Sequence, residues 1–113
     1  MNHPKYRKCV RAFSLTFALL GFSLTASAQG GGAAVYKSKC AGCHSPDGSG
    51  SGPAGKAMHL RDLGSMDVQK QSDADLTAII ANGKGSMPGY KGKLTDDQIK
   101  DVVSFIRSLA KKG

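Results

Sequence analysis

The clearest hydrophobic pattern lies near the C-terminus, where apolar residues recur at intervals of three and four. The residues that follow this pattern are Ile99, Val102, Val103, Ile106 and Leu109. Such spacing places apolar side chains on one face of an amphipathic helix. The preceding Thr95-Asp96-Asp97-Gln98 has the form of a capping box, and Lys111 and Lys112 suit the negative end of a helix. The pattern predicts a helix that begins after Thr95.

A second helix is predicted between Ser72 and Gly83. Ser72 is a capping-type residue followed by two early aspartates, and Leu76, Ile79 and Ile80 form an apolar face. Gly83 is suited to end the helix, because glycine adopts the left-handed conformation common at helix C-termini. The sequence therefore predicts a helix with a defined beginning and end.

The remaining elements are less strongly patterned. Residues 33–43 are predicted to form a first helix after a flexible lead-in of three glycines at 30–32. A short helix is expected around residues 60–70, although the pattern there is weak. No run alternates between apolar and polar residues in the manner of a strand, so we expect an all-α protein without β-strands.

The first 28 residues have the organisation of a secretory signal peptide. Basic residues precede an uncharged run over residues 12–24, and Ala26-Ser27-Ala28 forms a small-x-small cleavage pattern. A transmembrane helix needs about 20 apolar residues, so the run is short for an anchor, although an uncleaved anchor or a buried helix is the alternative. We expect cleavage after Ala28, export to the periplasm, and loss of Cys9 with the leader. The working domain would then be residues 29–113.

Composition changes once this leader is set aside. The whole chain has a net charge of +8, and residues 29–113 retain +4. Only three aromatic residues remain, with fourteen glycines. A domain of this size rarely obtains more than about 3–5 kcal/mol from its own core, and this core is sparse. We therefore expect a group other than side chains to fill part of the interior. The reduced charge also removes the main argument for nucleic-acid binding.

The segment Cys40-Ala41-Gly42-Cys43-His44 admits several interpretations. A disulfide across so short a loop would stabilise the fold weakly, and a thioredoxin-like pair needs a βαβ pattern that is not visible. A zinc site would need a second pair of ligands, and His59 is the only other histidine after the leader. The C-x-x-C-H string is the signature of covalent c-type haem attachment. Export and a sparse core favour that interpretation, with His44 as the proximal ligand.

A haem iron with a proximal histidine takes a second ligand or leaves that position open. Met87 lies in a glycine-rich loop between two predicted helices, and Pro88 favours an extended backbone at Met87. Its thioether is our predicted distal ligand, and His59 is the competing candidate. Met58 and Met66 are expected to fill gaps in the core.

These motifs together resemble the small class I bacterial monohaem cytochromes c. The resemblance depends on Cys40-Ala41-Gly42-Cys43-His44, on Gly83-Lys84-Gly85-Ser86-Met87-Pro88 and on the closing amphipathic helix. It implies three to five helices around one covalent haem c with His44 and Met87 as iron ligands. It also implies that the Pro53 carbonyl holds the His44 imidazole, and that the first and last helices cross. Tyr36 and Phe105 are the candidates for that crossing, or for covering the haem.

The predicted function is electron transfer rather than catalysis. Two axial ligands would leave the iron no open position, and the sequence contains no array of a nucleophile and a general base. We expect the partners to be redox proteins that dock transiently, and not nucleic acids, and we expect contact with membranes only through membrane-bound redox complexes. Lys84, Lys91 and Lys93 are candidates to steer an acidic donor or acceptor toward a monomeric carrier. The alternatives are a subunit dedicated to one oxidoreductase complex, a haem sensor or peroxidase-like protein with a labile methionine, and a non-haem thiol–disulfide protein.

Overall fold

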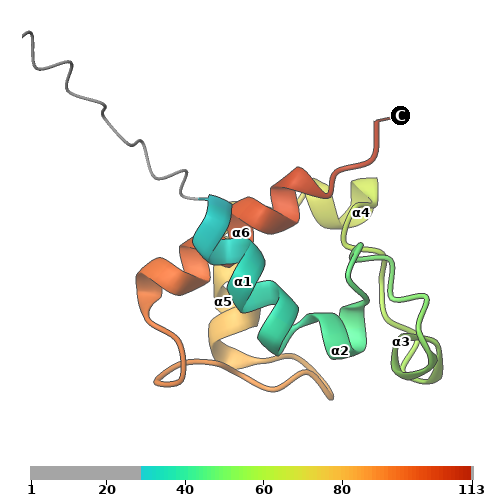
Figure 1. Cartoon of the computed structure of the whole chain (residues 1–113), viewed down its shortest axis with the longest axis horizontal. Helices are drawn as coiled ribbons and strands as arrows, with labels where there is room; N and C mark the ends of the chain where they lie inside the picture. The colour runs from blue at the N-terminus through green and yellow to red at the C-terminus, as the bar shows by residue number, and fades with distance from the viewer. Residues whose placement is uncertain (1–28, 113) are drawn as a thin grey trace, which may run out of the picture.

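The computed structural model describes residues 29–112, which form six helices around a central space (Figure 1). In chain order the helices are α1 (Gln29–Lys39), α2 (Ala41–His44), α3 (Pro53–Ala57), α4 (Met66–Gln69), α5 (Asp73–Asn82) and α6 (Asp96–Ser108). Within these residues only two isolated β-bridges occur and no strand is formed, so the all-α prediction is confirmed. The predicted signal peptide and its cleavage site lie outside the described residues.

The crossing of α1 and α6 is the main contact between distant parts of the chain (Figure 1). Gly32 lies so close to α6 that a Cβ atom built on it would be 2.0 Å from the carbonyl oxygen of Asp101. One turn further, the rings of Tyr36 and Phe105 pack at a centroid distance of 4.7 Å. The predicted helix crossing and its aromatic pair are therefore confirmed.

The prediction for the first helix was wrong at both of its ends. The three glycines at 30–32 belong to α1 rather than to a flexible lead-in, and Gly31 and Gly32 lie close against Asp101 of α6. The helix also does not continue to residue 43. It ends at Lys39, and α2 begins at Ala41 after a break at Cys40, whose backbone angles are φ −115° and ψ −38°.

Helices α5 and α6 begin and end as their sequences predict. In α5, Ser72 accepts a hydrogen bond from the Asp75 amide, while the Asp75 carboxylate accepts one from the Ser72 amide. Thr95 and Gln98 form the equivalent reciprocal pair at α6. Each such cap stabilises a helix by about 1 kcal/mol. Gly83, with φ of +80°, follows the last residue of α5.

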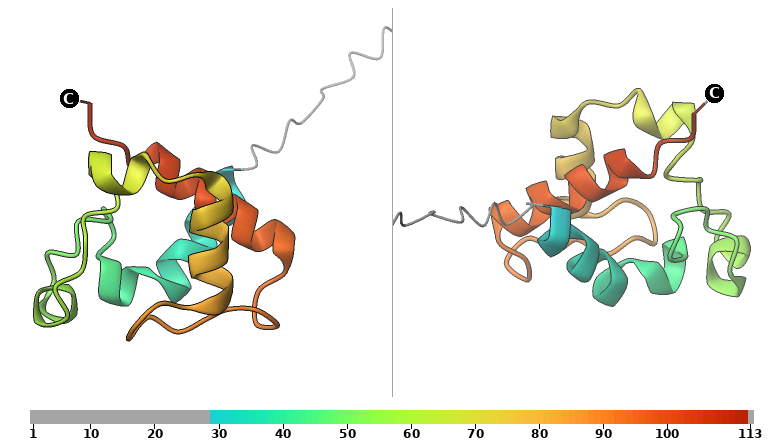
Figure 2. Two further views of the ribbon diagram at one scale, coloured as in Figure 1. Left: turned by 180° about the vertical axis from the view of Figure 1, so that it is seen from behind. Right: turned by 45° about the horizontal axis from the view of Figure 1, so that its top comes forward.

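The apolar face of α6 supplies much of the core. Residues of α1, α4 and α5 complete the core. Its buried hydrophobic side chains are Tyr36, Val68, Leu76, Ile80, Ile99, Val102, Val103 and Ile106. Figure 2 shows α5 packed across α6, with α4 near the C-terminal end of α6. Most of the predicted apolar stripe is thus confirmed, and Leu109 lies just beyond the helix as its half-buried C-cap.

The segment between α2 and α5 contains more irregular backbone than predicted. The helix expected around residues 60–70 is restricted to the four residues of α4, and α3 was not predicted at all. α3 begins at Pro53, whose fixed φ suits the first position of a helix. Its five residues are too few to show a hydrophobic period, which explains why the sequence pattern did not indicate it.

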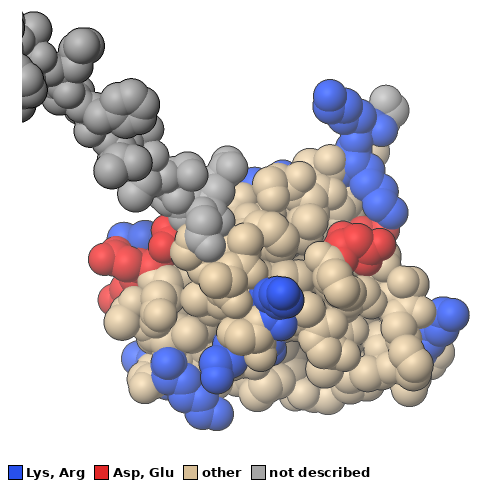
Figure 3. Space-filling model, viewed as in Figure 1, with Lys and Arg blue, Asp and Glu red and all other residues tan. Residues whose placement is uncertain are grey.

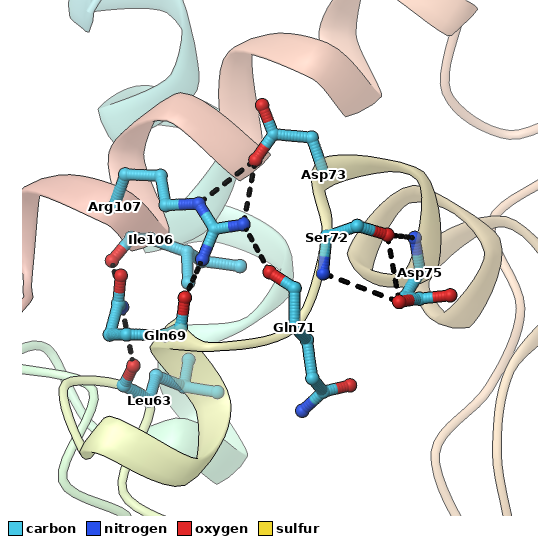
Figure 4. Close-up of polar contacts among 8 residues, drawn as sticks. All are labelled: Leu63, Gln69, Gln71, Ser72, Asp73, Asp75, Ile106 and Arg107. Atoms are coloured by element: carbon cyan, nitrogen blue, oxygen red, sulfur yellow. Dashed lines mark hydrogen bonds and ion pairs between the residues drawn. The ribbon is translucent and has the colours of Figure 1, made fainter.

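A polar network holds this irregular segment against α6 (Figure 4). The Gln69 amide donates to the carbonyl oxygens of Leu63 and Ile106, at 2.8 and 2.9 Å. The Arg107 guanidinium donates to the carbonyl oxygens of Gln69 and Gln71 and pairs with Asp73. These bonds give partners to backbone carbonyls of the irregular segment and of the α6 end, and they hold that segment against α6.

Candidate functional site

Two adjoining cavities occupy the space between the helices. The larger, of about 220 Å³, is walled mainly by apolar side chains of α5 and α6, including Leu76, Ile80 and Val102. The smaller, of about 100 Å³, lies between α2 and the segment over residues 86–90. Four residues line both cavities, namely Cys40, His44, Leu60 and Met87. The cavities therefore form one apolar slot, and three of the predicted site residues, Cys40, His44 and Met87, line both parts of it.

The C-x-x-C-H motif forms one side of this slot. Both Cys40 and Cys43 are free thiols, the first half-buried and the second exposed. Burial, and then the neighbouring Cys43, raises the pKa of the Cys40 thiol. Catalytic thiols have lowered pKa values that keep them as thiolates. The raised pKa disfavours the thiolate at Cys40, and residues 29–112 contain none of the strands of a thioredoxin fold.

The His44 imidazole is half-buried and has an unusual environment. Burial lowers its pKa, which favours the neutral ring that can bind a metal. Its Nδ1 is the one buried side-chain nitrogen or oxygen in the described part of the chain without a hydrogen-bond partner. Buried polar atoms are nearly always paired. The described polypeptide thus leaves one polar atom of the His44 ring without a hydrogen-bond partner.

The hydrogen bond implied between His44 and Pro53 is absent from this structure. Nothing among residues 29–112 accepts from or donates to the Nδ1 atom. Pro53 instead is exposed and occupies the first position of α3, where its ring starts the helix. The resemblance therefore implied a contact that the fold described here does not form.

Ser45, which the sequence analysis did not single out, fixes the backbone beside His44. It has φ of +67° and ψ of 156°, a conformation that is essentially restricted to glycine. Its carbonyl accepts a hydrogen bond from the Tyr36 hydroxyl at 2.7 Å, and its own hydroxyl accepts one from the Gly52 amide at 3.1 Å. Since serine is not a typical left-handed residue, the sequence carried no sign of this role.

Met87 lies on the other side of the slot, in what we call the Met87 loop, residues 83–94. Reciprocal hydrogen bonds between Lys84 and Met87, of 3.1 and 3.0 Å, close a two-residue turn at its tip. Gly85, in this turn, has φ of +58°. Met87 is half-buried and lines both cavities together with His44. The structure therefore brings the two predicted iron ligands to the same slot.

The other methionines and the second histidine lie elsewhere. Met58 and Met66 are 39% and 82% exposed, so the prediction that they fill gaps in the core was wrong. Both belong to the short surface segments around α3 and α4, and Met58 contributes to the smaller cavity. His59 is exposed and lines neither cavity. The structure thus gives no support to His59 as the distal ligand.

The arrangement fits a covalently attached haem better than a bare metal ion. No group of three or more His, Cys, Asp or Glu side chains in residues 29–112 could hold a metal ion by itself. By contrast, an apolar slot with two free thiols, a neutral imidazole and a thioether on its walls offers each chemical group that haem c requires. The unpaired Nδ1 atom of His44 also favours a bound group at this site.

Comparison with known proteins gives a consistent result. Residues 27–106 match the family described as cytochrome C oxidase, cbb3-type, subunit III. Cytochrome c6 of Gloeothece citriformis is 34% identical, with 95% of this chain and 98% of that protein covered. Cytochrome c6 of Leptolyngbya boryana is 38% identical over 73% of this chain and 93% of that protein. Among solved structures, KustC0563 c-type cytochrome is similar with a TM-score of 0.66 and 29% identity, over 71% of this chain and 98% of that chain.

None of the helices described between residues 29 and 112 is both long enough and apolar enough to cross a membrane.

Proposed function

The chain belongs to the c-type cytochromes, in the family of the cbb3-type cytochrome c oxidase subunit III, and on this basis we propose that it is a one-electron carrier with His44 and Met87 as iron ligands. It carries one covalently bound haem c. When bound, this group supplies the ferrous–ferric couple. The observation that carries the ligand assignment is that His44 and Met87 line the same two cavities.

In the proposed site, Cys40 and Cys43 hold the haem through two thioether bonds. The break at Cys40 separates α2 from α1, so that Cys40 flanks the start of α2 while Cys43 and His44 lie at its end. His44, whose backbone is fixed through Ser45 and Tyr36, supplies the proximal nitrogen. The residues that attach the haem are therefore positioned by the most deeply buried part of the fold.

Electron transfer without catalysis follows from this ligand set. Two protein ligands leave no position for substrate, and methionine raises the reduction potential relative to a second histidine. The apolar walls of the slot act in the same direction, since a low dielectric disfavours the additional charge of ferric iron. Ligands fixed by helices and a tight turn also limit the structural change that accompanies each transfer.

We further propose that the carrier is a periplasmic monomer that docks transiently on redox proteins. Lys84, Lys91 and Lys93 of the Met87 loop are exposed and take part in none of the ion pairs among residues 29–112. Figure 3 shows basic side chains along the edge formed by this loop, separate from the acidic groups on the same face. Association rates with an acidic partner should therefore fall as the salt concentration rises.

The ligand assignment is tested by absorption spectra of protein matured with haem c in the periplasm. Wild type should show the sharp reduced α and β bands of low-spin haem c and a ferric methionine–iron charge-transfer band. Met87→Ala should lose that band and bind carbon monoxide rapidly when reduced. Met58→Ala is the matched control, because Met58 lines the smaller cavity from the opposite segment and is not a proposed ligand.

Four outcomes would contradict the proposal. A charge-transfer band that survives in Met87→Ala would exclude Met87. A wild-type protein that lacks this band, and whose low-spin spectrum is lost in His59→Ala, would identify His59 as the distal ligand. Protein with two free thiols and no Soret band would exclude haem attachment altogether. Rapid carbon monoxide binding by wild type would favour the sensor or peroxidase-like alternative.

A further inference from the structure

A single hydrogen bond joins the Met87 loop to the helix that precedes the C-x-x-C-H motif. The Tyr90 hydroxyl donates to the carbonyl oxygen of Lys39 at 3.0 Å, across 51 residues of sequence. Lys39 is the last residue of α1 and directly precedes Cys40. Tyr90 itself is half-buried, and it lines the smaller cavity beside both segments. The bond therefore spans the mouth of the slot.

The Lys39 carbonyl is available because the backbone breaks at Cys40. In a continuous helix this carbonyl would accept from the amide of Cys43, four residues later. Here the Cys43 amide donates to the Cys40 carbonyl instead, at 3.2 Å. The Lys39 oxygen is thus one of the unsatisfied acceptors that a helix C-terminus leaves. The break that forms the attachment motif creates the acceptor that Tyr90 uses.

The other hydrogen bonds that leave the Met87 loop go to α5. The amides of Tyr90 and Lys91 donate to the carbonyls of Ile80 and Ala81, each at 2.9 Å. Gly89 packs so closely on this helix end that a Cβ atom there would be 2.7 Å from the Ala81 oxygen. Among residues 29–112, the Tyr90 hydroxyl makes the one hydrogen bond from the Met87 loop to α1 or α2. The base of the loop is fixed without Tyr90, but its position across the slot is not.

We propose that Tyr90 is a latch that holds the Met87 loop closed over the slot and thereby sets how readily Met87 leaves the iron. This inference rests on the proposed function, because it takes Met87 as the distal ligand. Tyr90 acts through Met87 as a positioning residue. Since a hydrogen bond of this kind stabilises by about 0.5–1.5 kcal/mol, removing the hydroxyl should make loop opening about three- to tenfold more frequent.

The test compares Tyr90→Phe with Ser38→Ala in the ferric, haem-loaded protein. Each substitution removes one side-chain hydroxyl that donates to a backbone carbonyl, but only Tyr90 belongs to the Met87 loop. Imidazole is the probe, and the measured quantity is its limiting binding rate at high concentration, which reports the opening of the Met87 loop. Tyr90→Phe should raise this rate about three- to tenfold. Ser38→Ala, whose hydroxyl bonds to Val35 within α1, should leave the limiting rate near that of wild type.

A second measurement separates the latch from the ligand assignment. Amide hydrogen exchange at Lys84 and Met87, which pair across the tip of the loop, reports loop opening whether or not Met87 binds iron. Faster exchange at both amides in Tyr90→Phe, with an unchanged rate of global unfolding, supports the latch. If Met87→Ala retains the charge-transfer band, the ligand assignment fails, and amide hydrogen exchange alone then tests the latch. A Tyr90→Phe protein with wild-type exchange and imidazole binding would overturn the latch.

Discussion

The two sides of the slot are built in different ways. The side that carries Cys40 and His44 depends on contacts between distant residues, such as the packing of Tyr36 on Phe105 and of Gly32 on Asp101. The Met87 loop depends on contacts between near neighbours, and residues 83–94 contain no fully buried residue. Among the described residues, one hydrogen bond joins this loop to the opposite side, from the Tyr90 hydroxyl to the Lys39 carbonyl.

This difference predicts which side opens. Contacts between distant, buried residues are lost only when much of the fold is lost, whereas segments with local bonds and little burial open on their own. The cysteines of the haem-attachment motif therefore lie on the side of the slot that opens only when much of the fold is lost. Met87, the proposed distal ligand, belongs to the side that can open alone, and few bonds hold that side in place.

The largest effect is expected where α1 crosses α6. Gly32→Ala places a Cβ atom 2.0 Å from the Asp101 carbonyl oxygen, so the helices must separate. We expect a loss of about 3 kcal/mol in the free energy of unfolding, measured with chemical denaturant. Gly42→Ala is the matched control, because a Cβ atom there meets nothing within 4 Å. Equal stability of Gly32→Ala and wild type would show that the crossing is looser than described.

The next largest effect concerns the buried Tyr36 hydroxyl at high pH. Burial, followed by the nearby Cys40, raises the pKa of Tyr36 from 10.0 to about 12. The folded state thus holds this proton more tightly than the unfolded state does, so the stabilisation is complete below pH 10 and is lost as the pH rises toward 12. The loss should amount to about 2–3 kcal/mol.

The variant Tyr36→Phe isolates that contribution. At neutral pH it should be about 1 kcal/mol less stable than wild type, because the Ser45 carbonyl loses a hydrogen bond. Between pH 10 and 12 its unfolding free energy should fall less steeply than that of wild type, so the two stabilities converge and then cross. Parallel alkaline curves for the two proteins would contradict the assignment of this titration to Tyr36.

The sequence predicted the parts of the fold whose stability is local. The caps at Ser72 and Thr95 and the apolar face of α6 depend on residues three or four apart, which periodicity and capping patterns describe directly. The C-x-x-C-H motif and the glycine-rich segment around Met87 likewise carry their chemistry in adjacent residues. For this reason three of the predicted site residues could be expected at one slot before the fold was known.

What the sequence could not predict depends on contacts between distant residues. The glycines at 30–32 resemble a flexible linker until Asp101 is known to lie against Gly31 and Gly32. Ser45 is strained because Tyr36 and Gly52 hold it, and neither is a neighbour in sequence. The Tyr90 bond needs a helix break at Cys40 that no pattern indicates. Long-range packing, rather than local preference, decides each of these features.

Ser45 allows strain and hydrogen bonding beside His44 to be separated. Ser45→Ala keeps a side chain in the glycine-like conformation and removes the hydroxyl that accepts from Gly52, so it should lose about 1 kcal/mol. Ser45→Gly loses the same bond but relieves strain of about 1–3 kcal/mol, so it should be the more stable variant. Denaturant unfolding of both variants provides the comparison. An alanine variant at least as stable as the glycine variant would show that the backbone at Ser45 is not strained.

The smallest effect is expected at the start of α5, the helix that anchors the Met87 loop. Hydrogen bonds from the Ser72 side chain and amide lower the pKa of the Asp75 carboxyl below 3.8. Its contribution is therefore present above pH 3.8 and is lost as the pH falls through the folded-state value. In Asp75→Asn the unfolding free energy should fall less steeply between pH 5 and 3 than in wild type. The effect should be small, because the cap is exposed and local.

The control is Asp97→Asn, since Asp97 shares the first turn of a helix but forms no hydrogen bond through its side chain in the described residues. If both variants flatten the acid limb equally, the helix dipole rather than the capping bond is responsible, and the anchor of the Met87 loop does not depend on Ser72.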